Sequence, residues 1–177
     1  AYEMLRSLVG SEMCIRDSFT MALTTYTGQN LGAMQYDRAK KGARFGILVS
    51  ITLAELIGVG MYVFAPQLIS IFTPTPEVIA LGTQQARTIA LFYCLLAYSH
   101  AVASVCRGAG KAFVPMTIML ATWCALRIVY ITTVMHIVHE IQYIYWAYPL
   151  TWSVSSVIYF IYYHRSDWIH GFEAKKH

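Results

Sequence analysis

Three ionisable residues lie inside long apolar stretches, and the first of these is an acid. Glu55 lies about three helical turns into its stretch. In a membrane, a carboxylate at that depth costs a few kcal/mol or more, so it should face the bundle interior or water. Such a group can bind a proton or a cation, with Thr52 and Tyr62 as candidate neighbours. A protonated or hydrogen-bonded packing residue is the alternative.

The other two are arginines. Arg87 lies about three turns from Glu77, and Arg127 lies near the middle of its own stretch. Both can bond helix-end carbonyls or a carboxylate elsewhere in the protein, and Arg87 can more easily extend its head group to the interface. We favour structural pairing over a gating role, and we keep both as candidates for an ion or substrate pathway.

A polar and aromatic midsection follows Arg87 along the chain, at Tyr93, Tyr98, Ser99 and His100. Tyr93 and His100 are seven residues apart, so they share one helical face. Aromatic rings on such a face can bind organic cations through cation–π contacts. Buried tyrosines that bond neighbouring helices are the alternative.

Enzymatic chemistry is not indicated by any motif. His136-x-x-His139-Glu140 has metal-like spacing but lacks an evident third ligand, and we interpret it as a polar turn. Gly108-Ala109-Gly110-Lys111 lacks the phosphate-loop spacing, and Ala112 stands where that loop has a hydroxyl. The four cysteines form no C-x-x-C pair. We therefore predict no catalytic residues, no metal site and no cofactor other than a coupling ion.

Composition excludes several classes of protein. Of 177 residues, 57% are apolar and 12% are charged. So few charges could hardly cover the surface of a soluble domain of this size. A soluble enzyme, a nucleic-acid-binding protein and a disordered tail are thereby disfavoured, even though the net charge is +4.

Apolar stretches of membrane-spanning length organise the chain. A helix needs about 20 residues to cross the hydrocarbon core. Turn residues separate the stretches, because prolines 74 and 76 and glycines 108 and 110 interrupt a helix. The predicted fold is therefore all-α, a polytopic bundle with four full spans, at 45–72, 78–106, 112–138 and 141–163, and the end of a fifth, at 19–27.

Charge placement predicts the orientation of this bundle. If each stretch crosses once, all the loop and tail Lys and Arg residues from residue 28 onward fall on one side, and none falls on the other. Such an excess marks the cytoplasmic side, so the C-terminal tail 164–177 should be cytoplasmic. The nine residues are Arg38, Lys40, Lys41, Arg44, Arg107, Lys111, Arg165, Lys175 and Lys176.

Small side chains recur every four residues on two of the predicted spans. In lipid, helices associate by close backbone approach across such faces. The faces indicate either static bundle packing, which we favour, or a sliding surface in a moving transporter. They comprise Gly46, Ser50, Ala54 and Gly58 on one span, and Gly82, Ala86, Ala90 and Cys94 on the next.

The loops between the spans resemble those of a known family. The segments Gly28–Ala33 and Gln35–Ala39 are similar to the loop between helices eight and nine of the multidrug and toxic compound extrusion (MATE) family. Arg107–Gly110 resembles that family's turn between helices ten and eleven. Trp123-x-x-x-Arg127-Ile128 and Trp146–Pro149 resemble stretches of its last two helices. The loop motif residues that carry the resemblance are Gly28, Gln29, Gly32, Arg107, Gly108 and Gly110.

The resemblance implies a fold and an activity. The chain would supply the end of helix eight and helices nine to twelve of a two-lobed antiporter in the plasma (inner) membrane. Its partners would be the N-terminal lobe of the same transporter, the lipid bilayer and a cationic or amphipathic substrate, with no nucleic acid. Sodium ions or protons would be the coupling ion. A related exporter of a lipid-linked substrate and a non-transporting half-bundle are the alternatives.

The chain departs from the family pattern at several positions, and one of them concerns ion binding. The family often has glycine where this chain has Met34. Some members carry an ion-site carboxylate on helix ten, about three turns before the arginine of the glycine turn, where this chain has Leu95, Leu96 and Ala97. Residues 1–18 do not join the resemblance, and we expect them to be a non-native leader.

Overall fold

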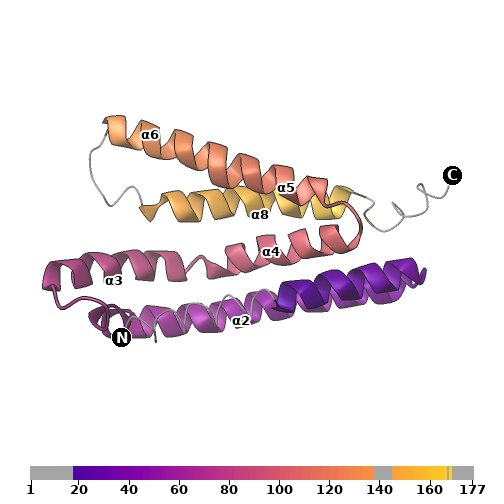
Figure 1. Cartoon of the computed structure of the whole chain (residues 1–177), viewed down its shortest axis with the longest axis horizontal. Helices are drawn as coiled ribbons and strands as arrows, with labels where there is room; N and C mark the ends of the chain where they lie inside the picture. The colour runs from indigo at the N-terminus through magenta and orange to yellow at the C-terminus, as the bar shows by residue number, and fades with distance from the viewer. Residues whose placement is uncertain (1–17, 138–144, 167, 169–177) are drawn as a thin grey trace.

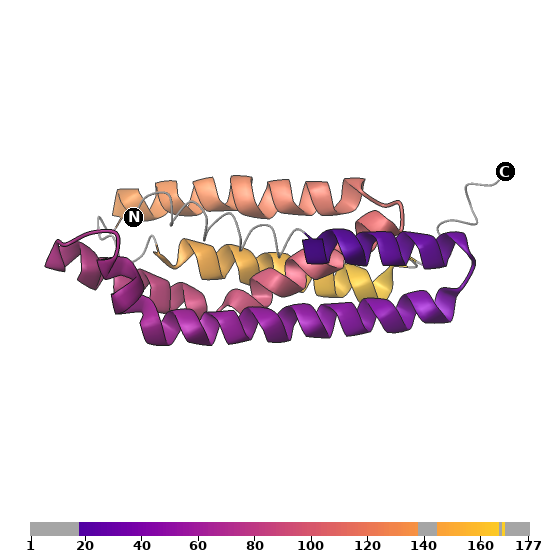
Figure 2. The same cartoon turned by 60° about the horizontal axis from the view of Figure 1, so that its bottom comes forward.

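The structure is a computed structural model that describes residues 18–137, 145–166 and 168. These residues fold into helices, which agrees with the predicted all-α class. A first helix over 18–32 is followed by α2 (Tyr36–Ser70), and α2 runs back antiparallel to it. Figure 2 shows the two joined by one tight turn.

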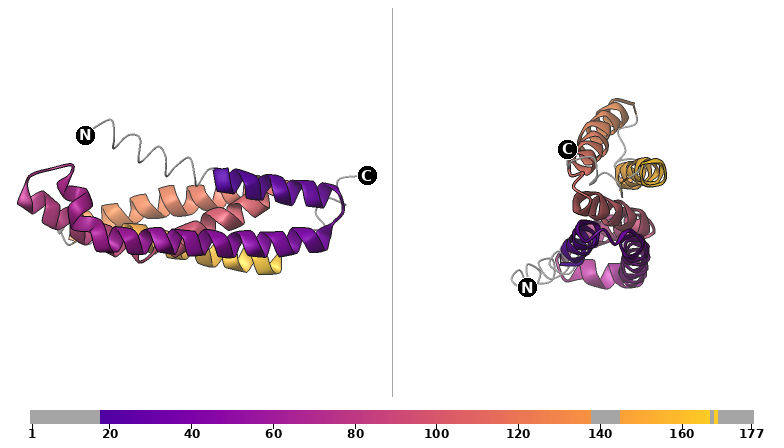
Figure 3. Two further views of the ribbon diagram at one scale, coloured as in Figure 1. Left: turned by 90° about the horizontal axis from the view of Figure 1, so that it is seen from below. Right: turned by 90° about the vertical axis from the view of Figure 1, so that its right-hand side faces the viewer.

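The remaining helices continue the alternation along one long axis (Figure 1). The sequence order is α3 (Pro76–Ala90), α4 (Tyr93–Gly108), α5 (Phe113–Met119), the π-helix η1 (Leu120–Leu126), α6 (Arg127–Ile137) and α8 (Ala147–Arg165). Pro76 opens α3, as expected where the missing N–H has no helical partner. Figure 3 shows the elongated bundle from two further sides, one of them along its length.

Two of the described helices are long and apolar enough to cross a membrane. They are α2, with 35 residues, and the continuous helix Phe113–Val134, which runs from α5 through η1 into α6. The pair α3 and α4 would make a third span if it is counted as one. α8 has 19 residues but is rich in tyrosine and serine. The count of four full spans therefore stays a prediction.

The expected single span 78–106 is broken. α3 ends at Ala90, α4 begins at Tyr93, and the two are bent by 51°. No proline or glycine stands at Leu91 or Phe92. α2 approaches the break closely, since a Cβ on Gly58 would lie 2.8 Å from the Ala90 carbonyl oxygen. This contact is described further below.

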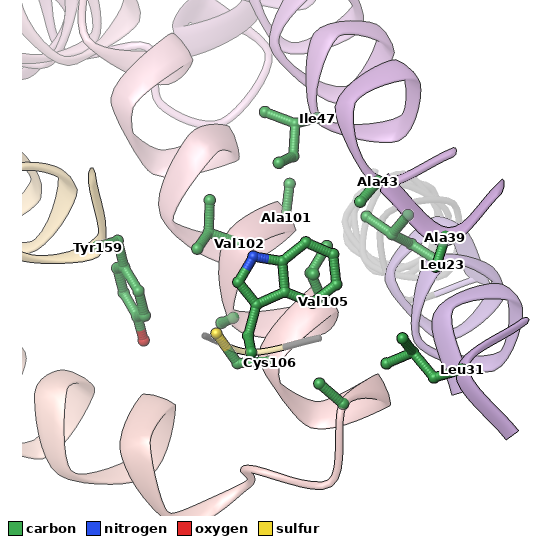
Figure 4. Packing of buried hydrophobic residues seen from close by; sticks show 13 residues of the cluster. Leu23, Leu31, Ala39, Ala43, Ile47, Ala101, Val102, Val105, Cys106 and Tyr159 are labelled. Carbon is green, nitrogen blue, oxygen red and sulfur yellow. The ribbon is translucent and has the colours of Figure 1, made fainter. Parts of the chain in front are cut away.

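The core lies around α4, the most buried helix of those described. Close packing of small and branched side chains joins it to the first helix, α2 and α8. Trp168, which the sequence places in the tail, is 4% exposed and stacks on Tyr163. Figure 4 labels ten residues of this cluster: Leu23, Leu31, Ala39, Ala43, Ile47, Ala101, Val102, Val105, Cys106 and Tyr159.

The outer surface of the bundle is apolar. On α2, Phe45 is 70% exposed and Leu56 is 65% exposed. Exposed apolar side chains on this scale would be unfavourable in water but suit contact with lipid or with further helices.

Basic residues gather at one end of the bundle. The start of α2, the turn between α4 and α5, and the last residue of α8 all lie at the right-hand end in Figure 1. These segments contain the described members of the predicted basic set, including Arg38, Arg107 and Arg165. The described turn at the other end, residues 71–75, contains no Lys or Arg. The described loop and tail Lys and Arg residues therefore share one end of the bundle, and its cytoplasmic orientation stays a prediction.

Two turns at that basic end share one geometry. At the end of the first helix, Gln35 N–H donates to the Asn30 carbonyl and Met34 N–H to the Leu31 carbonyl. After α4, Lys111 N–H donates to Cys106 and Gly110 N–H to Arg107 in the same pattern. Both are Schellman caps, which need a left-handed residue. That residue is Met34 (φ 57°) in one and Gly110 (φ 73°) in the other.

We predict opposite effects from exchanging residue types at these two caps. Met34→Gly should stabilise the protein by about 1 kcal/mol, because a side chain disfavours left-handed backbone. Gly110→Ala should destabilise it by about the same amount for the same reason. Thermal unfolding of purified protein in detergent measures both. A Met34→Gly variant with an unchanged unfolding midpoint would contradict the cap assignment.

Candidate functional site

Glu55 lies in the contact between α2 and α4. Its side chain is half-buried, and its Oε2 atom is shielded from solvent without a hydrogen-bond partner among the described residues. The thiol of Cys94, one residue into α4, is close enough to interact with the carboxylate. Glu55 therefore faces the neighbouring helix, as its cost in lipid requires.

The two predicted neighbours of Glu55, Thr52 and Tyr62, make contacts with other groups. The Thr52 hydroxyl donates to the carbonyl of Leu48, in its own helix, at 2.9 Å. The ring of Tyr62 lies under the guanidinium of Arg87, with 5.4 Å from Cζ to the ring centroid. Cys94 is the neighbour that the sequence did not point to.

Glu55 also lies beside the helix break. Gly58 is one turn further along α2, and its missing side chain leaves room for the Ala90 carbonyl oxygen and the Tyr93 Cβ atom. A break frees backbone carbonyls from the helical ladder, and in membrane proteins such backbone is placed where it is buried or lines a cavity. The carboxylate and the break therefore form one polar region inside an apolar helix pair.

Arg87 and Arg127 are both partly paired within the described chain. The Nε atom of Arg87 donates to the Tyr62 carbonyl at 3.4 Å. Arg127 donates from Nη2 to the Thr151 hydroxyl at 3.2 Å, and its Cζ lies 4.5 Å from the centroid of the Tyr148 ring. The Nε of Arg127 is shielded without a hydrogen-bond partner. The two arginines thus contact hydroxyl, carbonyl and aromatic groups, and the choice between structural pairing and gating stays a prediction.

The aromatic midsection of α4 turns toward α8 and η1. Tyr93 lies 6.1 Å from Trp152, and His100 lies 5.3 Å from Trp123, between ring centroids. Tyr98 packs against the core cluster. Of these rings, that of Tyr93 also approaches α2 one turn from Glu55, since a Cβ on Gly58 would lie 3.6 Å from its Cδ2 atom. Their role in binding a cation stays a prediction.

Hydrogen bonds around Ser99 hold this face of α4 against α8. Its hydroxyl lies 3.1 Å from that of Ser155 and 3.0 Å from that of Ser156, and Ser156 donates to the Leu95 carbonyl. These buried hydroxyl contacts fasten α4 to α8, which is a structural rather than a binding function.

Two of the predicted loop motifs meet in space. A Cβ on Gly108 would lie 2.5 Å from the Thr24 carbonyl oxygen, and one on Gly28 would lie 3.2 Å from the Gly108 carbonyl oxygen. Arg107 donates to the Ser104 hydroxyl at 3.0 Å. Gln29 and Gly32 are exposed. Gly28 and Gly108 thus allow the first helix to cross α4 with the two backbones in contact.

Comparison with known proteins shows which family the chain belongs to. The sequence model of the MatE family matches residues 10–133, well over half of the chain. The chain belongs to the MatE family. The match confirms the resemblance read from the loops, and it begins inside the segment 1–18, whose origin stays a prediction.

Curated MatE-like relatives are distant in sequence. The probable multidrug resistance protein NorM of Thermotoga maritima is 28% identical over 107 residues, which is 60% of this chain and 23% of that protein. The probable multidrug resistance protein YoeA of Bacillus subtilis is 22% identical over 147 residues, 82% of this chain and 32% of that protein. NorM of Bacillus cereus is 31% identical over 103 residues. The chain thus spans about a quarter to a third of the length of these relatives.

We predict that the crossing of the first helix with α4 tolerates no side chain. Gly108→Ala should destabilise the protein by about 1–3 kcal/mol, because the backbone of the first helix must move away. Gly32→Ala is the matched control, since its Cβ would meet no atom within 4 Å. Thermal unfolding in detergent compares the two. Equal unfolding midpoints for both variants would show that the crossing is not tight.

Proposed function

We propose that this chain is part of a secondary antiporter that exports cationic or amphipathic compounds in exchange for sodium ions or protons. Membership of the MatE family and the names of the curated relatives support multidrug export. The observation that supports coupling of export to an ion gradient is the position of Glu55. Its shielded Oε2 atom has no hydrogen-bond partner within the described residues.

A carboxylate in this position suits ion exchange. An unpaired carboxylate oxygen away from water is costly, and a proton or a sodium ion removes that cost. An ion drives transport only if it binds one conformation better than another. Because the carboxylate lies between two helices, a change in their spacing would change its ion affinity.

Glu55 can also replace the carboxylate that some family members carry on helix ten and that this chain lacks there. Family members that carry an acid there would place it near Leu95, which is apolar in this chain. Glu55 interacts with Cys94, the residue just before Leu95. We infer that α2 supplies from the adjacent helix the carboxylate that the corresponding helix lacks.

The basic end of the bundle supports an orientation of the chain in the membrane. The described Lys and Arg residues of the predicted cytoplasmic set lie at one end of the bundle, where the turn after α4 and the end of α8 meet (Figure 1). Basic residues near span ends are retained in the cytoplasm. We propose that this end faces the cytoplasm from the plasma (inner) membrane, with the N-terminal lobe of the same transporter as partner.

We predict that Glu55→Gln uncouples export. In everted vesicles that contain the whole transporter, uptake of a fluorescent lipophilic cation should fall at least about tenfold, because a neutral amide cannot exchange a proton or a sodium ion. Imposing the proton and the sodium gradient separately identifies the ion. Glu55→Asp should restore part of the rate.

Glu77→Gln is the matched control for Glu55→Gln. It removes the same charge in the first turn of α3, at an exposed position. Gradient-driven uptake should survive this change. Undiminished uptake in Glu55→Gln would remove Glu55 from the mechanism, and an equal loss in both variants would attribute the effect to charge alone.

The orientation has its own test. Green fluorescent protein folds only on the cytoplasmic side of the inner membrane, and alkaline phosphatase only on the outer side. Fused after the last residue, the fluorescent protein should therefore fluoresce and the phosphatase should be inactive. Both reporters inserted in the turn 71–75 should give the reverse result. Matching signals at the two places would contradict the proposed sidedness.

A further inference from the structure

The π-helix η1 interrupts the continuous helix Phe113–Val134, and nothing in its own sequence requires the interruption. Its residues include no proline or glycine, and leucine and alanine, which favour the α-helix, make up most of them. A π turn closes i→i+5 hydrogen bonds, so it holds one residue more than an α turn, and such turns are frequent at functional sites. The export mechanism proposed above does not use this segment.

Contacts with α8 hold the helix on both sides of η1, where the two lie side by side (Figure 1). On the α5 side, the hydroxyl of the fully buried Tyr159 donates to the Pro115 carbonyl at 3.1 Å. On the α6 side, Arg127 donates to the Thr151 hydroxyl at 3.2 Å and lies on the Tyr148 ring. Because both sides are held, the residue in excess of an α-helix stays between them as a wider turn.

Two donors at this turn have no acceptor within the described chain. The Nε1 atom of Trp123, in η1, and the Nε atom of Arg127, directly after it, are shielded from solvent and make no hydrogen bond. The Trp123 ring contacts the His100 ring edge to face, at 5.3 Å between centroids. Shielded donors without partners cost free energy, and native structures contain few of them. The present register of η1 therefore leaves part of the hydrogen-bonding capacity of this segment unused.

We propose that η1 is a register switch, in which conversion of the π-helix to an α-helix moves α6 against α5 and α8 during transport. The conversion displaces one side of the segment relative to the other by about one residue, which is about 100° of rotation and about 1.5 Å along the helix. The inference rests on the proposed function only for the use of the second register.

The contacts with α8 indicate which side moves. The hydrogen bond of Tyr159 is buried, so α5 stays in place. Arg127 is half-buried and one hydrogen bond attaches it to α8, so α6 is the side that is released. Substrate or coupling ion drives this movement by binding one register better than the other.

Spin-label distances in the whole transporter in lipid nanodiscs test the switch. The native cysteines are replaced by alanine, and two pairs share a label at the exposed Val157 of α8, with the second label at Met116 on α5 or at Ile128 on α6, both exposed. A label about 5 Å from the helix axis moves by about 8 Å in a rotation of about 100°. Each pair is measured without ligand, with a saturating lipophilic cation, and with the coupling ions.

One of the two pairs should respond. The distance between Ile128 and Val157 should gain a second population in at least one of these conditions, and the distance between Met116 and Val157 should stay constant. Constant distances in both pairs would overturn the proposal. An equal change in both pairs would also overturn it, because the whole helix would then move as one body.

Deletion of Ala125 removes the residue that the wider turn holds. Ala125 is exposed, so its loss removes no core contact, and the shortened helix can be α-helical throughout with both attachments to α8 in place. The variant should bind the lipophilic cation about as tightly as the parent protein but transport it at least about tenfold more slowly. Ala125→Leu keeps the residue count and should transport normally. Undiminished transport by the deletion variant would overturn the switch.

A second pair of variants decides the case in which the deletion variant fails to fold. Thr151→Val removes the acceptor of Arg127, and Thr151→Ser keeps it. Without ligand, Thr151→Val should populate the second distance between Ile128 and Val157 several-fold more than Thr151→Ser does. Equal populations would overturn the release of α6.

The outcomes also separate the switch from the antiporter. Gradient-driven export by a protein in which the distance between Ile128 and Val157 never changes would refute the switch alone. A protein that populates both registers but shows no gradient-driven export would refute the antiporter and retain the switch.

Discussion

Backbone contact between helices at small residues is the interaction on which the rest of this structure depends. In lipid, apolar side chains gain little by leaving one apolar surface for another, so helices associate where their backbones can approach. Gly108 meets the first helix at the Thr24 carbonyl, and the backbone of Gly46 leaves room for the Leu23 side chain of that helix. Gly58 meets Ala90 at the end of α3. These contacts fix α2 and the broken helix as one unit.

That unit explains why the polar groups lie where they do. Glu55 is between Gly46 and Gly58, so α2 is held against its neighbours on both sides of the carboxylate. Its Oε2 atom is shielded from solvent in this arrangement. A transporter that changes conformation by altering helix spacing would therefore change the surroundings of Glu55 directly, without a relay through other residues.

Apolar run length and turn residues predicted a large part of this fold. The stretches that should cross the membrane became helices, because the hydrocarbon length and the prolines and glycines of the turns are local features. The small faces also met neighbouring helices, at Gly46, Gly58 and Gly82. The break at Leu91 and the π-helix Leu120–Leu126 had no local signal, since neither contains proline or glycine. They depend on contacts with other helices.

The candidate site was predictable only in part for the same reason. Glu55, Arg87 and Arg127 could be named because a charge in an apolar stretch is conspicuous. Their partners could not, because Cys94 and Thr151 are ordinary residues of other helices and become neighbours only through packing.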